Sequence, residues 1–97
     1  ISFANEQKKL VCAICAAPKI LGAMGILEGK KAICFPGFED ELKGAIISTQ
    51  RVVADGNIIT SRGAGTAHDF AFCIAEKLGK TKEAKEIRNA MQYDFCE

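Results

Sequence analysis

The chain begins with a short, continuously apolar run that leads into a stretch with helical spacing. Residues 10–14 read Leu-Val-Cys-Ala-Ile, and apolar residues then recur at helical spacing as far as Leu27. So short and uniformly apolar a run is typical of a strand buried on both faces. Pro18 fits the first turn of the helix that follows, where its missing N–H costs nothing. We therefore predict a buried strand at Val11–Ile14 and, after it, a helix that ends near Gly25 to Gly29.

The middle of the chain alternates short apolar runs with turn residues. Residues 31–35 form a short predicted strand, stopped by Pro36-Gly37, and a short, charged helical link follows at residues 38–43. Two β-branched runs then flank Asp55-Gly56, a dipeptide that favours the positive φ needed at the centre of a tight turn. We therefore predict a hairpin, with its strands at residues 51–54 and 57–60.

Two helical patterns close the chain after a tight loop at residues 61–65. Thr66 is expected to open the first helix, with Asp69 three residues later completing a capping box, and Gly79 to end it. Residues 81–91 form the second, more charged helix. The side chains expected to face inward are Phe70, Ile74 and Leu78 in the first helix, and Ala84, Ile87 and Met91 in the second. The order strand, helix, strand, hairpin, helix, helix is that of the later half of a layered α/β domain.

The beginning of the chain suggests that part of this domain lies elsewhere. There is no initiator Met, and residues 5–9 look like the end of a helix already under way. The strand at Val11–Ile14 would also need parallel neighbours that the chain barely supplies. We therefore expect a fragment, or one chain of a cleaved protein.

Length, composition and charge indicate a small globular domain and argue against binding to nucleic acid or to an anionic membrane. The 97 residues make one small domain at most, and the hydrophobic content of 48% is that of a globular protein. A net charge of +1, with no block of one sign, offers no electrostatic footprint for nucleic acid or an anionic membrane. No apolar stretch approaches the roughly 20 residues of a membrane span.

The five cysteines are an odd number without the spacing of a disulfide framework. Four of them lie in apolar segments, as buried reduced thiols do, which favours a reducing compartment and hence the cytoplasm. Cys12 and Cys15 match Cys-x-x-Cys, but residues three apart on a strand point to opposite faces with Cα atoms about 10 Å apart. Because a disulfide needs about 7 Å or less, we reject a redox pair here. We also reject a zinc site and interpret Cys12 as a core residue.

Cys15 is the strongest candidate for chemistry. It lies where the predicted strand meets the helix, beside backbone N–H groups and the positive end of a helix dipole, which favours the thiolate. Ala13 and Ala17 supply the small residues that a sharp turn needs, as the glycines of a nucleophile elbow do. The alternative is a small apolar core residue. We favour a reactive cysteine, although no general base stands beside it in the sequence.

Three further features are interpreted more conservatively. His68, the only histidine, lies off the buried face of its helix and is interpreted as a solvated residue at the helix start. Gly63-Ala64-Gly65 before Thr66 is similar to a phosphate loop, but it lacks the Gly-Lys-Ser/Thr end and follows a hairpin rather than a parallel strand. Arg62 could bind an anion or pair with a carboxylate, and a structural ion pair is the favoured interpretation.

Two blocks of the chain, taken together, resemble a known family. Ala13-Ile14-Cys15-Ala16-Ala17-Pro18 resembles the elbow of the ThiJ/PfpI superfamily, in the DJ-one/YajL (ThiJ-like) branch. The second block resembles the hairpin and last loop of that branch, with Ala64 in place of a frequent proline; it comprises Arg51-Val52, Asp55-Gly56 and residues 59–66. The resemblance covers nearly the whole chain, and it identifies residues 1–97 as the C-terminal part of a single ThiJ/PfpI-like domain.

The resemblance implies a flavodoxin-like fold, an α/β three-layer sandwich around a parallel sheet. Cys15 matches the nucleophilic, oxidisable cysteine, the Ala16 backbone contributes to the oxyanion site, and Phe35 and Pro36 belong to the pocket. The family's partner for the thiol is a glutamate near its N-terminus, which this chain lacks. The implied partners are therefore the missing N-terminal half, in the same or a separate chain, and a second copy of the complete protein. No cofactor and no metal are implied.

Two positions depart from parts of the superfamily. The protease-like branch has a histidine directly after its cysteine, where this chain has Ala16, which argues against a PfpI-type peptidase. A His-Pro pair near the cysteine is replaced by Phe35-Pro36, as in the bacterial ThiJ-like members, so the pocket is expected to be more apolar. The resemblance implies a glyoxalase III or deglycase-like enzyme acting on α-oxoaldehydes. The alternative is a redox-sensing stress protein or chaperone in which Cys15 is oxidised to sulfinic acid.

Overall fold

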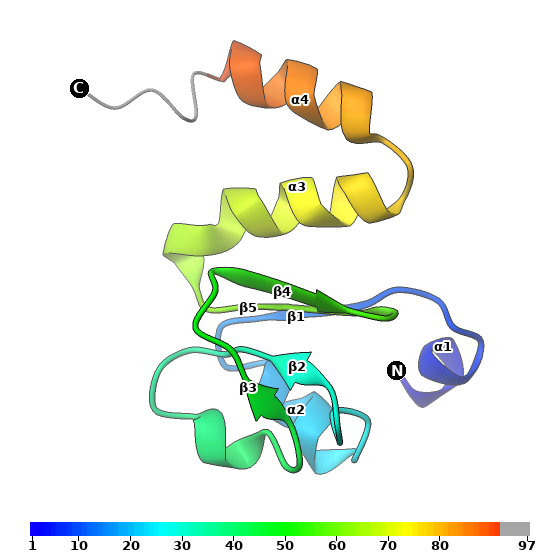
Figure 1. Cartoon of the computed structure of the whole chain (residues 1–97), viewed down its shortest axis with the longest axis vertical. Helices are drawn as coiled ribbons and strands as arrows, with labels where there is room; N and C mark the ends of the chain where they lie inside the picture. Colours follow the sequence, from blue (N-terminus) through cyan, green and yellow to red (C-terminus); the bar gives the residue numbers. More distant parts are fainter. Residues whose placement is uncertain (92–97) are drawn as a thin grey trace.

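The structure, a computed structural model, describes residues 1–91; residues 92–97, among them Cys96, lie outside the described part. Figure 1 shows a sheet with α3 along one face and α2 on the other, so the predicted layered α/β architecture is confirmed. The elements are α1 (Ser2–Glu6), β1 (Val11–Ile14), α2 (Pro18–Ala23), β2 (Lys31–Ala32), the 3-10 turn η1 (Glu39–Glu41), β3 (Ile46–Ile47), β4 (Val52–Asp55), β5 (Ile58–Ser61), the 3-10 turn η2 (Ala64–Thr66), α3 (Ala67–Lys77) and α4 (Thr81–Ala90).

The central strand of the main sheet is β5. It lies between β1 and β4, and all four of its residues are buried. It runs parallel to β1, with Val11 opposite Ile58, and antiparallel to β4, with Val52 opposite Ser61. The loop after β5 therefore does follow a strand with a parallel neighbour, contrary to the prediction. β2 and β3 form a second, parallel pair. The two-residue strand β3 was not predicted, because so short a run carries no periodicity.

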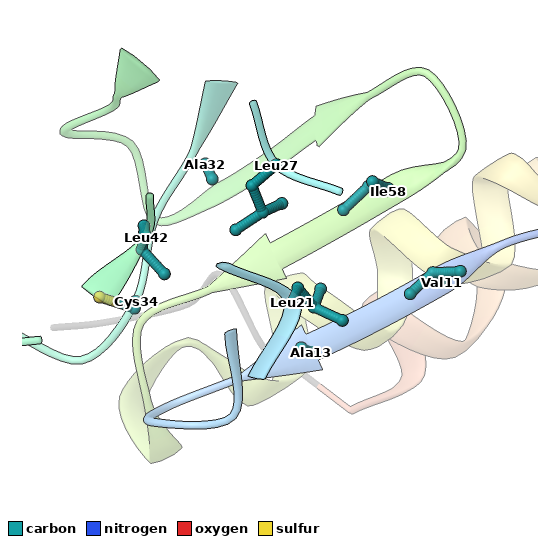
Figure 2. Close-up of a cluster of buried hydrophobic side chains, with 8 residues drawn as sticks. All are labelled: Val11, Ala13, Leu21, Leu27, Ala32, Cys34, Leu42 and Ile58. Atoms are coloured by element: carbon teal, nitrogen blue, oxygen red, sulfur yellow. The ribbon is translucent and has the colours of Figure 1, made fainter. Parts of the chain in front are cut away.

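The main hydrophobic core lies between the sheet and α2. Figure 2 shows the side chains that form it, namely Val11, Ala13, Leu21, Leu27, Ala32, Cys34, Leu42 and Ile58. Alternation along β1 turns Val11 and Ala13 towards this core, and Cys12 to the opposite face. The prediction that Cys12 is a core residue is therefore wrong: its side chain is exposed.

The hairpin forms as predicted, with its turn shifted by one residue. Asp55 pairs with Ile58 across the hairpin, so the two turn residues are Gly56 and Asn57 rather than Asp55 and Gly56. Gly56 supplies the positive φ, at +61°. Asp55 stays in β4 and accepts a hydrogen bond from the Lys31 N–H at 2.8 Å, which ties the hairpin to β2. The Asn57 side chain donates to the Asn5 side chain, at 2.9 Å, and so holds α1 against the turn.

The strand predicted at residues 31–35 is shorter in the structure because its later amides bond elsewhere. The Ile33 N–H donates to the buried Thr60 hydroxyl at 3.0 Å, and the Phe35 N–H donates to the Cys15 carbonyl at 2.7 Å. Only Lys31 and Ala32 pair with β3. The segment after β2 therefore forms hydrogen bonds with β5 and with the Cys15 turn instead of extending the sheet.

The helix after Cys15 is also shorter than predicted and ends at Ala23. Gly25 adopts φ +77°, and its N–H donates to the Gly22 carbonyl while the Ile26 N–H donates to the Leu21 carbonyl. This is the Schellman arrangement that terminates a helix. It brings Ile26 against the core.

The capping box predicted at the start of α3 is wrong. Thr66 does precede α3, but the capping box is absent, since the Thr66 hydroxyl bonds Gly63 and Ser61 and the Asp69 carboxylate pairs with Arg51 and Arg88. The buried side chain of α3 is Phe72, covered by the Arg88 guanidinium 5.0 Å from the ring centre.

The inward face predicted for α3 and α4 is only partly correct. Phe70 and Ile74 are half-buried and Ala84 is buried. Leu78, Ile87 and Met91 are exposed, at 62%, 55% and 48%. Gly79 ends α3 as predicted, with φ +83°. No helix within residues 1–91 has both the length and the apolar character that crossing a membrane requires.

Candidate functional site

Cys15 occupies a strained turn between β1 and α2. Its φ is +67°, in the left-handed region that costs a residue with a Cβ about 1–2 kcal/mol. Two hydrogen bonds hold this conformation: the Cys15 N–H donates to the Ser61 carbonyl at 3.1 Å, and the Cys15 carbonyl accepts from the Phe35 N–H. The side chain is exposed. The predicted sharp turn is thus present, with the thiol outside the core.

The backbone after Cys15 offers one amide that is free to bind an anion. The Ala17 N–H donates to the Ile14 carbonyl at 3.2 Å, and Pro18 has no N–H. Among residues 1–91, no acceptor bonds the Ala16 N–H. Because α2 has only six residues, its dipole is weaker than the sequence suggested, and the Ala16 amide is the more specific group.

Aromatic residues from the segment after β2 lie beside this turn. Phe35, which is 46% exposed, is fixed to Cys15 through its own N–H, and its ring lies 3.4 Å from where a Cβ on Gly63 would stand. The Phe38 ring stands 6.4 Å from the Phe35 ring, and the Lys19 ammonium lies 5.1 Å from the centre of the Phe38 ring. The structure therefore brings Cys15 and Phe35 together, and it places the Phe38 ring and the Lys19 ammonium beside Phe35.

The last loop is held by buried hydroxyls. The Ser61 hydroxyl donates to the Arg51 carbonyl at 2.8 Å and contacts the Thr66 hydroxyl, which donates to the Gly63 carbonyl at 2.9 Å. Arg51 also donates to the Gly65 carbonyl at 3.1 Å. These bonds place the Ser61 carbonyl where it receives the Cys15 N–H. The glycine loop is therefore a structural support of the Cys15 turn.

The other described cysteines are chemically different from a free nucleophile. Burial raises the pKa of the Cys34 thiol, and the nearby Glu39 carboxylate raises it further. Burial likewise raises the pKa of Cys73, followed by the effect of Glu76. Partial shielding from solvent and then the Cys73 thiolate raise the pKa of Cys12, although its side chain stays accessible. The expectation that the cysteines are mostly buried holds for Cys34 and in part for Cys73.

His68 and Arg62 are not brought into the Cys15 turn. His68 is exposed, as predicted, and lines a groove of about 380 Å³ between α3 and α4 that does not include Cys15. Arg62 is half-buried, and within residues 1–91 it forms no ion pair; Arg51 forms one instead, with its Nε 2.9 Å from the Asp69 carboxylate. Residues 1–91 also contain no cluster of three His, Cys, Asp or Glu side chains that could hold a metal ion.

Sequence reasoning did not select Lys19 or Phe38 for this site. Lys19 is four residues after Cys15, one turn along the predicted helix, and this spacing could have marked it. Phe38 becomes a neighbour only because Pro36-Gly37 reverses the chain and the Phe38 N–H donates to the Phe35 carbonyl at 3.2 Å.

Comparison with known proteins places this turn in a family. The family model described as DJ-1/PfpI matches residues 2–77. The chain is 46% identical to Protein DJ-1alpha of Drosophila melanogaster over 88 residues, which is 89% of this chain and 41% of that protein. It is 35% identical to the isonitrile hydratase of Pseudomonas putida over 89 residues, 90% of this chain and 39% of that protein. The chain thus spans less than half the length of these relatives.

Solved structures agree with the sequence match. The structure of oxidized Toxoplasma gondii DJ-1 superposes with a TM-score of 0.88 at 34% identity, over 97% of this chain and 52% of that one. Drosophila melanogaster DJ-1beta superposes with a TM-score of 0.82 at 35% identity, over 93% and 50%. These neighbours confirm the predicted flavodoxin-like fold class. The strand, the turn and the loop that fix Cys15 are therefore parts of a shared scaffold, and this chain belongs to the DJ-1/PfpI family.

Proposed function

We propose that this chain carries the nucleophile of a cysteine-dependent glyoxalase III or deglycase-like enzyme that acts on α-oxoaldehydes. The observation that supports the proposal most directly is the exposed Cys15 thiol in a strained turn whose two backbone groups are both fixed. A nucleophile held in this way needs little reorganisation before it attacks. The unbonded Ala16 N–H beside it is suited to a developing oxyanion.

The proposed reaction on methylglyoxal is redox-neutral and needs no cofactor. The Cys15 thiolate adds to the aldehyde carbon, and the resulting oxygen takes up a proton to give a hemithioacetal. The proton on that carbon then moves to the neighbouring ketone carbon, through an enediol, which leaves a thioester of lactate. Water hydrolyses the thioester, releases lactate and returns the thiol. A carboxylate must carry the proton, and we assign this role to the family's glutamate outside this chain.

The residues around Cys15 favour small substrates over peptides. Phe35 and Pro36 are exposed and apolar, and we propose that they form one wall of the pocket. Ala16 stands where a PfpI-type peptidase has a histidine, so the base that such a reaction uses is absent from that position. We further propose that residues 1–97 are the C-terminal part of one domain, completed by an N-terminal half and active as a homodimer in the cytoplasm.

The test is lactate formation from methylglyoxal by the complete protein that contains this chain. We expect turnover that falls at least about a hundredfold in Cys15→Ser. Cys34→Ala serves as the matched control, because Cys34 is buried in the core and should leave turnover within about twofold. Absence of turnover by the intact, folded protein would refute the proposal.

A second candidate is a redox sensor in which Cys15 is oxidised to sulfinic acid. The Cys15 thiol is exposed and forms no disulfide with another described cysteine, and both features support its further oxidation. Mass spectrometry after mild peroxide should find two added oxygens on Cys15 and not on the other cysteines. Equal oxidation of all the thiols would contradict this candidate.

A further inference from the structure

We propose that Cys12 and Cys73 form a second redox site, on the opposite face of the sheet from the core, which a hydroperoxide closes to a disulfide between β1 and α3. The inference is independent of Cys15 and of the reaction proposed for it. It adds a modification site and a cross-link between two segments that are 61 positions apart in the sequence (73 − 12).

The first observation is the direction in which Cys12 points. Its neighbours Val11 and Ala13 are 7% and 8% exposed and pack with Leu21 on the α2 face of the sheet, where Figure 2 shows them together. Since successive residues on a strand face opposite ways, Cys12 points to the α3 face. Its side chain is exposed rather than enclosed, so an oxidant can reach it.

The second observation is the position of Cys73. It lies in the middle of α3, which runs along this face of the sheet and contacts β1, β4 and β5 (Figure 1). The side chain of Cys73 is half-buried, next in sequence to the half-buried Ile74. Phe72, one residue earlier, faces Arg88 of α4 instead, so Cys73 is turned from the α4 side towards the sheet.

Cys73 also acts electrostatically on Cys12. The Cys73 thiolate contributes to raising the pKa of Cys12, which happens only between groups that are close in space. Partial shielding from solvent raises the pKa of both thiols, so neither is a ready nucleophile at neutral pH. Oxidation of this pair should therefore need a higher dose of peroxide than oxidation of an accessible, unhindered thiol.

The oxidation is balanced with hydrogen peroxide as the only co-reactant. The thiolate of one cysteine attacks a peroxide oxygen, the O–O bond breaks, and water leaves as that sulfur becomes a sulfenic acid. The second thiol then attacks the sulfenic sulfur, and a second water leaves as the S–S bond forms. Two thiols and one peroxide thus give one disulfide and two waters, with no over-oxidised product. A pair that closes in this way is protected from the sulfinic acid that an isolated thiol reaches.

The experiment is peptide mapping of the complete protein under non-reducing conditions after graded hydrogen peroxide. We expect one linked peptide pair, Cys12 with Cys73, lighter by two hydrogen atoms and lost on reduction. In Cys15→Ser the linked pair should form equally well. In Cys12→Ala and in Cys73→Ala it should be absent, and the remaining cysteine of the pair should become available to alkylation or to further oxidation.

Three outcomes would overturn the proposal. Both thiols could stay fully alkylatable even at peroxide doses far above those that oxidise Cys15 completely. Both could be converted separately to sulfinic acids with no linked peptide. Either could be found linked to Cys15, to Cys34 or to a second molecule instead. Since the mapping is done on the unsubstituted protein, the result does not depend on whether the alanine variants fold.

Discussion

The two faces of the sheet are packed in different ways, and the difference indicates which face contributes more to the stability of the fold. On the α2 face, Leu21, Leu27 and Leu42 are at most 3% exposed. On the α3 side, Leu78 and Ile87 remain mostly exposed, and the helices are fastened in part by charges on Asp69, Arg51 and Arg88. Apolar burial is the larger stabilising contribution, so the α2 face should dominate the free energy of unfolding. This is also the side from which the chain fixes the backbone of Cys15.

The largest loss of stability is expected when a side chain is added at Gly22, on the α2 face of the sheet. A Cβ built there would lie 2.2 Å from the Glu41 carbonyl oxygen and 2.9 Å from the Leu42 Cα, both of them backbone atoms that cannot move aside cheaply. We expect Gly22→Ala to lower the free energy of unfolding by about 3 kcal/mol in urea titrations.

A matched control for Gly22 is available in the same chain. Gly65 has no positive φ and open space around its Cα, so Gly65→Ala should change stability by less than about 0.5 kcal/mol. Equal losses at the two glycines would mean that the α2 face is not the tightly packed one.

A smaller loss of stability is expected when the buried Thr60 hydroxyl, which links β5 to the segment after β2, is removed. Thr60 is fully buried and its hydroxyl accepts the Ile33 N–H, so Thr60→Val leaves that amide without an acceptor. We expect a loss of about 1–3 kcal/mol in chemical denaturation. Thr60→Ser keeps the hydroxyl and should recover a clear part of the loss; if valine and serine cost the same, packing rather than the hydrogen bond is what matters at Thr60.

The smallest effect is expected from the charges on the α3 side. Asp69→Asn removes the carboxylate that pairs with Arg51 and Arg88, at 2.9 and 3.4 Å, both partly open to solvent. We expect a loss of about 0.5–1 kcal/mol at low salt, measured by thermal or urea unfolding. Near 1 M salt, where the screening length is about 3 Å, most of this difference should vanish. A loss larger than that of Thr60→Val, and unaffected by salt, would reverse the proposed ranking of the two faces.

The features that sequence predicted well are set by neighbouring residues. The strand Val11–Ile14, the hairpin around Gly56 and the helix stop at Gly79 depend on apolar runs and on glycines that adopt positive φ. Cys15 stands out for the same reason, since a strand that runs straight into a helix is visible in the order of residues.

The features that sequence did not predict depend on residues far apart in the chain. Asp69 could have capped its own helix, but Arg51 and Arg88 compete for its carboxylate, and neither is near it in sequence. The strand at residues 31–35 stops early because Thr60 and Cys15 supply acceptors for its amides. The uniformly apolar run predicts a core position for Cys12, whereas the burial pattern of β1 shows that the face carrying Cys12 is less covered.

The positive φ of Cys15 has a consequence for anyone who redesigns this chain. At this backbone geometry glycine is the conformationally favoured residue, and the cysteine is carried at a cost of about 1–2 kcal/mol. A search for more stable sequences, whether by library selection or by computation, will therefore tend to replace Cys15 with glycine. Stability alone is a misleading objective for this scaffold, because the substitution that it rewards most directly removes the thiol on which the proposed chemistry depends.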